Sequence, residues 1–219
     1  MEERWKAVDE YFEEKLGTTD DVMENILKET DEAGMRHIEV SKAHGKMLYL
    51  MAKMVEAKSI LEIGTLGGFS TVWLGRALPK GGRMATLEAD PKHAEVARRN
   101  IDSADLVARV DVIEGEALDR LPGLMDRGYL PFDLVFIDAD KENNAEYLKW
   151  ALKYSHEGSV IIVDNVVRQG RIIDDTEEKA APYIRKMFDM LEADGRIEAT
   201  AIQTVGKKGY DGFLMAVVK

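Results

Sequence analysis

The 219-residue sequence contains no cysteine, and none of its apolar runs is long enough to span a bilayer. The missing cysteines exclude a disulfide framework and thiolate metal sites, so a reducing cytoplasm is the predicted location. The first residues, MEERWKAVDEYFEEKL, carry charges throughout and lack the apolar region of a secretory signal. We therefore expect a cytoplasmic protein that does not enter a membrane.

Positive charge is also scarce, because 30 Lys and Arg stand against 41 Asp and Glu, for a formal net charge of −11. Such a chain repels nucleic acid phosphates, which disfavours a nucleic-acid partner. Most of these carboxylates are expected to form a solvated surface. The length suits one domain, residues 1–219, with N-terminal helices over 1–56 and a sheet core over 57–219.

Short β-branched runs alternate with longer amphipathic segments along the chain. The runs are KSILEI near residue 58, RMATLE near 83, RVDVIEG near 109, FDLVFID near 132 and GSVIIVD near 158. This alternation predicts crossover units and a parallel sheet. The segments STVWLGRAL, PKHAEVARRNI and NNAEYLKWALKYS have helical spacing; Pro91 is placed to begin the second helix and Gly158 to end the third.

The two ends of the chain differ from the middle. RIEATAIQTV and GFLMAVVK are strand-like and separated by a segment too short for a crossover helix, so they should form an antiparallel hairpin. Residues 1–56 predict two or three helices. Trp5, Val8, Phe12 and Leu16 recur at helical spacing and indicate a packing face.

Ligands of such sheets bind outside the carboxyl ends of the strands, and the first of these ends is LEIGTLGGFS, residues 61–70. Gly64 and Gly68 allow a tight turn and a close approach to a ligand. The dinucleotide pattern G-x-G-x-x-G is not met, because Leu66 and Phe69 replace two of its glycines. Glu62, unusual inside a parallel strand, is expected to pair with a positive group or a backbone donor at the ligand.

The next two strand ends favour a nucleoside ligand. Glu88, at the end of the second run, can accept hydrogen bonds from both hydroxyls of a ribose, although a solvent-exposed role is the simpler alternative. In EGEAL, Gly115 and Ala117 leave room for a flat base, or are ordinary small loop residues.

The fourth and fifth strand ends are acidic, with Asp138 in DLVFIDADKENN and Asp164 and Asn165 in VIIVDN. If these strands are adjacent, three oxygen ligands meet in one cleft, which suits Mg²⁺ or Mn²⁺. The alternative is that the two aspartates cap the helices that follow. Lys141 lies three residues after Asp138; a nearby divalent cation would disfavour its ammonium form and make it a candidate general base.

Taken together, LEIGTLGGFS, LEAD, EGEAL, FIDADK and VDN closely resemble the cation-dependent O-methyltransferases, the family of catechol and caffeoyl-CoA O-methyltransferases. The resemblance covers roughly residues 35–219, and DADK followed by DN is specific to that family. It implies an α/β, Rossmann-like class I methyltransferase fold. The sheet would have seven mostly parallel strands, an antiparallel last strand and helices on both faces.

The resemblance also implies which residues bind the cofactor, S-adenosylmethionine. Its amino acid end would be contacted by Glu62, Gly64 and Ser70. Its ribose would be bound by Glu88, its adenine would lie beside Ala117, and its methionine portion would be covered by Val40. By the same resemblance, Asp138, Asp164 and Asn165 would hold Mg²⁺, or Mn²⁺ or Ca²⁺, with Asp138 also close to the cofactor. Lys141 would be the catalytic base.

The expected reaction is therefore methylation of a phenolic small molecule, either a catechol or a hydroxycinnamoyl-type hydroxyl, by a homodimer. Methylation of a hydroxylated uridine in transfer RNA is an alternative that the acidity disfavours, and an NAD- or nucleotide-binding oxidoreductase or regulatory domain is a third. The acceptor pocket is expected to involve the loop 166–183. Arg168 and Arg171 could receive an anionic acceptor or be solvated, whereas Tyr147, Tyr210 and Phe213 could line the pocket or pack in the core.

Overall fold

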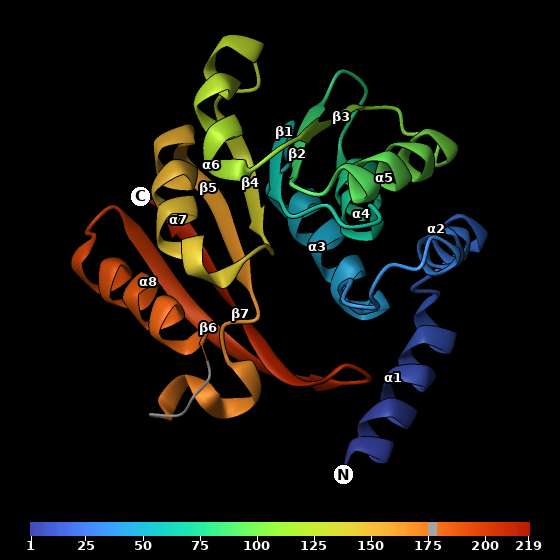
Figure 1. The fold of residues 1–219 in the computed structure, drawn as a ribbon. Helices are drawn as coiled ribbons and strands as arrows, with labels where there is room; N and C mark the ends of the chain where they lie inside the picture. The colour runs from blue at the N-terminus through green and yellow to red at the C-terminus, as the bar shows by residue number, and fades with distance from the viewer. Residues whose placement is uncertain (175–178) are drawn as a thin grey trace.

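The computed structural model describes residues 1–174 and 179–219 and is built around a seven-stranded sheet in the order β3-β2-β1-β4-β5-β7-β6 (Figure 1). The strands are β1 (Ser59–Ile63), β2 (Arg83–Glu88), β3 (Arg109–Glu114), β4 (Phe132–Ile137), β5 (Ser155–Asp164), β6 (Ile197–Gly206) and β7 (Gly209–Val218). The pairs among β1 to β5 are parallel, whereas β7 is antiparallel to both β5 and β6. The predicted fold class and the C-terminal hairpin are confirmed.

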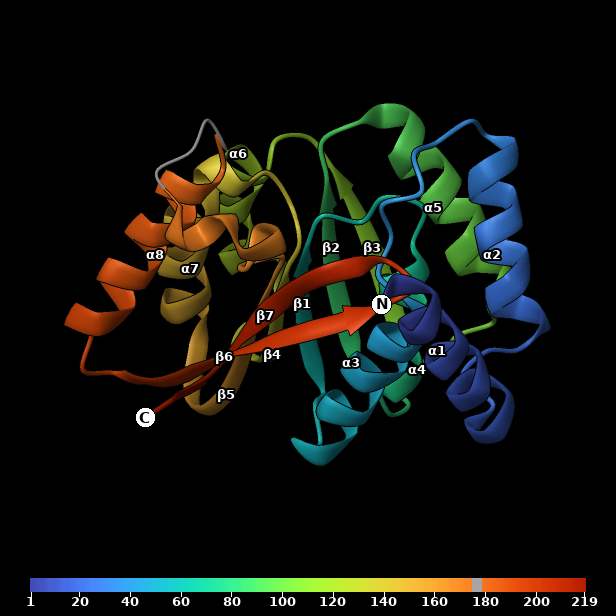
Figure 2. The ribbon, with the colours of Figure 1, turned by 90° about the horizontal axis from the view of Figure 1, so that it is seen from below.

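Helices cover both faces of the sheet (Figure 2). The α-helices of the described residues are α1 (Glu2–Leu16), α2 (Asp21–Glu32), α3 (Lys42–Met54), α4 (Phe69–Ala77), α5 (Pro91–Ser103), α6 (Ala117–Arg120), α7 (Asn144–Tyr154) and α8 (Ala181–Ala193). Short 3₁₀ helices are η1 (Leu121–Arg127), η2 (Lys141–Asn143) and η3 (Arg168–Ile173). Pro91 begins α5 as predicted, and Asp90 caps that helix by accepting hydrogen bonds from the N–H groups of Lys92 and His93.

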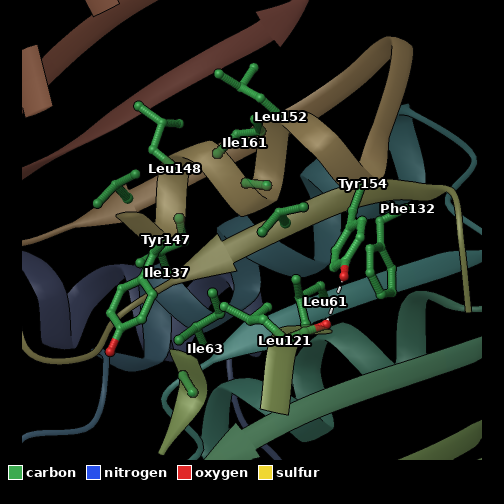
Figure 3. Packing of buried hydrophobic residues seen from close by; sticks show 14 of the residues in the cluster. Leu61, Ile63, Leu121, Phe132, Ile137, Tyr147, Leu148, Leu152, Tyr154 and Ile161 are labelled. Atoms are coloured by element: carbon green, nitrogen blue, oxygen red, sulfur yellow. Dashed lines mark hydrogen bonds between the residues drawn. The ribbon is translucent and has the colours of Figure 1, made fainter. Parts of the chain in front are cut away.

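Successive side chains of a β-strand point to opposite faces of the sheet, so the central strands contribute to two apolar layers, one on each face. Ile60 and Phe136 face the layer formed with α2 to α5, and Leu61 and Ile137 face the layer with α6, η1, α7 and α8. In the second layer Phe132 and Tyr154 lie together, and the Tyr154 hydroxyl donates to the backbone oxygen of Leu121 at 2.8 Å (Figure 3). Because both faces are covered, β1 and β4 are apolar except at Ser59, Glu62 and Asp133.

One detail of the prediction is wrong. The helix before β5 ends at Tyr154, and Gly158 lies inside β5 with φ 87°. The β4–β5 register shifts there, since Phe132 pairs with Ser155 but Leu134 pairs with Val160. The glycine therefore permits a bulge in a strand, a role that uses the same left-handed conformation as a helix stop.

Helix α1 does not bury its predicted packing face within this chain. Its predicted packing face is largely exposed, with Val8 at 43%, Phe12 at 48% and Leu16 at 69% of full exposure. The helix is held by polar contacts with the β6–β7 turn: Asp9 accepts from the Lys207 N–H at 2.7 Å, and Glu13 accepts from the Lys207 side chain at 2.6 Å. Figure 1 shows this turn reaching across toward α1. Among the described helices, none combines the length and apolarity needed to cross a membrane.

Candidate active site

A cavity of about 1090 Å³ lies at the carboxyl ends of the parallel strands. It is lined by the loops after β1 to β5, by the segment before α3 and by the β6–β7 turn. Of the residues predicted to form the site, those that line it are Val40, Gly64, Ser70, Glu88, Ala117, Asp138, Lys141, Asp164 and Asn165. The sheet topology thus gathers them from positions far apart in the sequence.

The turn after β1 brings the backbone close to the end of β4. Gly64 has φ 99°, and a Cβ atom placed there would lie 2.0 Å from the backbone oxygen of Asp138. Gly68, with φ 86°, precedes α4 and directs the N-terminus of that helix, including Ser70, at the cavity. Both glycines adopt the positive φ of a tight turn, as predicted, and Gly64 alone also allows a close backbone approach, to Asp138; their approach to a ligand stays a prediction.

Glu62 lies behind this turn and is fully buried. Its carboxylate accepts hydrogen bonds from three hydroxyl groups, those of Ser70 at 2.6 Å, Thr86 at 2.6 Å and Thr71. The expected positive or backbone partner is therefore wrong. Burial raises the pKa of Glu62 to about 7, although the three hydroxyl donors oppose that shift. Glu62 acts on the cavity through Ser70, which it orients.

Glu88 stands at the end of β2 and is fixed by backbone donors. One carboxylate oxygen accepts from the N–H groups of Thr65 at 3.2 Å and Leu66 at 2.8 Å, and the other accepts from Asp90 N–H at 3.0 Å. Each carboxylate oxygen can accept more than one hydrogen bond. A side chain that is held rigidly and still lines the cavity is suited to receive paired hydroxyls.

The acidic end of β4 and the acidic end of β5 meet through Lys141. Its Nζ donates to Asp138 Oδ1 at 3.1 Å and to the backbone oxygen of Asp164 at 3.1 Å. Neither aspartate caps a helix, because Asp140 precedes η2 and Val167 precedes η3. The capping alternative is therefore wrong for both.

Asp164 is buried, at 6% exposure. Burial and the negative charge of Asp138 raise the pKa of its carboxyl to about 8, while Lys141 opposes the shift. One oxygen accepts from Asn165 N–H at 2.8 Å. A buried acid beside a second acid needs a compensating cation or a proton, which is the condition expected of a cation site.

The sequence did not single out His44, which reaches the same place from the first turn of α3. Its Nδ1 lies 3.7 Å from Asp164 Oδ2, its ring centroid lies 5.5 Å from that of Phe213, and burial lowers its pKa. Ser41 caps this helix by accepting from the His44 N–H at 3.2 Å. A lone histidine in a helix carries no spacing signal, so only the folded chain reveals its position.

The remaining candidates divide between the cavity and its surroundings. Arg168, Tyr147 and Phe213 line the cavity, and Tyr147 and Phe213 are also buried in the core. Asp140 accepts from the Tyr147 hydroxyl and from the Asn143 side chain at 2.6 Å, which gives it a role in orienting its neighbours. Tyr210 donates to Gln203. The loop expected over 166–183 includes residues 175–178, which lie outside the described residues.

A seven-stranded sheet with an antiparallel β7, a glycine turn after β1 and an acid at the end of β2 defines a class I methyltransferase. The comparison with known families makes the assignment more specific. Residues 13–216 match the O-methyltransferase family model, and the chain belongs to that family. The resemblance read from the motifs is therefore confirmed, and the chain is an O-methyltransferase.

Similar proteins support this assignment over nearly the full length. The catechol O-methyltransferase of Niastella koreensis is 47% identical over 216 residues, 98% of each chain. An O-methyltransferase from Bacillus cereus, solved in complex with SAH, is 50% identical with a TM-score of 0.97 and complete coverage of both chains. TomG from Streptomyces achromogenes, solved in complex with SAM, is 42% identical with a TM-score of 0.95 over 100% of this chain and 98% of that one.

Proposed function

We propose that this O-methyltransferase transfers the methyl group of S-adenosylmethionine to a hydroxyl of a catechol-type small molecule, with the help of a divalent cation. The observation that carries the proposal is the meeting of Asp138, Lys141 and Asp164 at the two central strand ends, inside a cavity that also contains Glu88. The catechol O-methyltransferase at 47% identity supports a catechol over the hydroxycinnamoyl-type alternative.

The donor set fits a hard divalent cation. Asp138, Asp164 and Asn165 offer two carboxylates and an amide oxygen at one edge of the cavity, and hard cations prefer such oxygens. Among the residues that the structure describes, no three His, Cys, Asp or Glu side chains form a metal cluster, so the amide of Asn165 is required in the set. Mg²⁺ or Mn²⁺ fits better than Ca²⁺, which takes more ligands.

Such a cation, when bound, would lower the pKa of a phenolic hydroxyl, ordinarily about 10, and hold its oxygen in place. Lys141 is placed to take the proton that the hydroxyl loses. Lys141 approaches from η2 and is only 10% exposed, so water competes little for the proton.

The other half of the cavity is proposed to bind the methyl donor. Glu88 would accept the ribose hydroxyls, and the turn at Gly64 with Ser70 would contact the amino acid end. Ala117 and Val40 would bound the adenine and the methionine portion. Asp138 lies between the two halves, because its backbone contacts the Gly64 turn while its carboxylate contacts Lys141.

The decisive experiment measures SAH formed from S-adenosylmethionine with a catechol, a hydroxycinnamoyl thioester or bulk transfer RNA as the acceptor, with and without Mg²⁺. We expect turnover with the catechol and Mg²⁺. Turnover with transfer RNA alone would replace the proposal by the RNA alternative. Calorimetry with NAD tests the oxidoreductase alternative, and NAD binding in preference to S-adenosylmethionine would contradict the assignment of the cavity.

A homodimer and a cytoplasmic location stay predictions. The exposed apolar side chains of α1, among them Phe12 and Leu16, are consistent with a partner subunit that covers them. Light scattering coupled to size exclusion tests the dimer, and a monomer at micromolar concentration would contradict it.

A further inference from the structure

The loop that follows the proposed cation ligands has an unusual backbone. Asn165, Arg168 and Gln169 have positive φ values of 57°, 55° and 59°. Such values are uncommon for residues other than glycine and persist only where the surroundings fix them. The antiparallel ladder of β5 and β7 ends at the pair Asp164 and Phe213, so strand pairing alone does not hold this loop.

The side chain of Asp211 provides the missing support. Its Oδ1 accepts hydrogen bonds from the N–H groups of Val167 at 3.1 Å, Arg168 at 2.9 Å and Gly212 at 2.9 Å. A carboxylate that accepts several backbone N–H groups makes strong, charge-assisted hydrogen bonds. Asp211 is half-buried and lies on the cavity wall, two residues before Phe213 in β7.

Gly212 completes the support. Its backbone oxygen accepts from the Val166 N–H at 3.0 Å. A Cβ atom at Gly212 would lie 2.3 Å from the backbone oxygen of Ile202 and 2.6 Å from a methyl group of Val167, so glycine is what allows the loop to lie this close. Three successive N–H groups, from residues 166 to 168, are thus paired with two adjacent residues of β7.

We propose that Asp211 is a positioning residue, which with Gly212 fixes the loop after Asp164 and thereby holds the Asn165 side chain at the cation-binding edge of the cavity. The inference rests on the proposed function, because it assigns Asn165 to the cation. The same loop carries Arg168, which lines the cavity, so Asp211 also fixes the backbone position of Arg168 on the acceptor side of the cavity. Glu88 and the Gly64 turn belong to other strand ends, so the methyl-donor half is independent of it.

The test is Mn²⁺ affinity, measured by calorimetry on the protein without acceptor. Groups that orient metal ligands change metal affinity by roughly 10- to 100-fold, and we expect a loss of that size for Asp211→Ala. Asp211→Asn keeps an oxygen that can accept the same N–H groups but loses the charge that strengthens these hydrogen bonds, so its loss of affinity should be clearly smaller than that of Asp211→Ala. S-adenosylmethionine affinity should be unchanged in both variants.

Asp133→Ala is the matched control. Asp133 also accepts two backbone N–H groups, from Lys58 at 2.7 Å and Ser59 at 2.8 Å, but at the opposite end of the sheet. It should lose stability without losing Mn²⁺ affinity. Unchanged Mn²⁺ affinity in Asp211→Ala, or an equal loss in Asp211→Asn, would overturn the positioning role.

Hydrogen exchange of the wild type provides a measurement that no variant can spoil by misfolding. The amides of Val167 and Arg168 should exchange slowly, and exchange as fast as that of the exposed Gly81 amide would overturn the proposal. A wild type that binds no Mn²⁺ would overturn the cation part of the proposed function itself, and with it this role for Asp211. The two failures are therefore distinguishable.

Discussion

Lys141 Nζ lies 3.1 Å from Asp138 Oδ1, three residues back along the chain, at the point where β4 gives way to η2. The same nitrogen lies 3.1 Å from the backbone oxygen of Asp164 at the end of β5. One amine therefore bridges two adjacent strand ends. Because the 3₁₀ turn brings it back over Asp138, Lys141 is held within the cavity instead of extending into solvent.

Replacing Lys141 by Ala should lower the turnover of a catechol acceptor by roughly 10²- to 10⁴-fold, the usual contribution of a general base. S-adenosylmethionine affinity should change little, because the proposed donor contacts come from other loops. The measurement is the turnover number from pH 6 to 9 with saturating Mg²⁺.

Lys149 offers a matched control for that substitution. It pairs with Glu146, also three residues back, at 2.7 Å, but both side chains are about half exposed on α7. Lys149→Ala should leave turnover unchanged. Loss of activity in both variants, or in neither across that pH range, would remove Lys141 from the role of base.

Removal of divalent cations should abolish methyl transfer while leaving S-adenosylmethionine binding largely intact. The reason is that Asp164 and Asn165 serve only the cation in the proposal, whereas Glu88 is fixed by the backbone N–H groups of Thr65 and Leu66. Activity after EDTA treatment, followed by titration with Mg²⁺, gives the measurement. Full activity in EDTA would contradict the cation assignment.

The sequence predicted the fold best at positions where a residue pattern is compatible with only one kind of structure. Acids at Asp138 and Asp164, at the ends of otherwise apolar strands, point to the edge of a parallel sheet, and β4 and β5 are indeed neighbours. The hairpin of β6 and β7 followed from the short connection between them. In each case the structure favoured by the local sequence is the one that the whole fold requires, so the local sequence was enough to predict it.

The sequence was least informative where one residue type serves several structures. Gly158 fits a helix stop and a strand bulge equally well, because both use a positive φ. Glu62 showed that something must satisfy a buried acid, but not that three hydroxyls from α4 and β2 would do so. His44 and Asp211 act through contacts with distant segments, which single-sequence spacing does not encode.

Glu62 should make the stability of the cofactor-free protein fall as the pH rises. Its pKa is raised to about 7 from an ordinary 4.5, so the folded state binds the proton more tightly than the unfolded chain. The resulting stabilisation is present below pH 4.5 and is lost as the pH rises through about 7. At roughly 1.4 kcal/mol per unit, the loss is on the order of 3 kcal/mol.

Urea unfolding of the wild type and of Glu62→Gln at pH 5 and pH 8 measures this loss. The glutamine does not titrate, so the difference in unfolding free energy between the two proteins should change with pH in favour of the variant. Parallel stability curves would show that Glu62 stays ionised, held by its three hydroxyl donors.

Gly64→Ala should damage both stability and the site, because the new Cβ would lie 2.0 Å from the backbone oxygen of Asp138. Gly81→Ala separates this collision from backbone strain. Gly81 also has a positive φ, 85°, but has open space around its Cβ position. Strain alone costs on the order of 1–3 kcal/mol, so the control should lose about that much unfolding free energy and keep its S-adenosylmethionine affinity.

Gly64→Ala should lose clearly more, since β1 and β4 must separate at their carboxyl ends to accommodate the methyl group. That separation displaces Asp138, so S-adenosylmethionine and Mn²⁺ should both bind more weakly, as calorimetry would measure. Equal losses of stability in the two variants, with ligand affinities unchanged, would mean that the backbone of the Gly64 turn shifts to accommodate the methyl group while Asp138 stays in place. The close contact between Gly64 and Asp138 would then have no part in assembling the site.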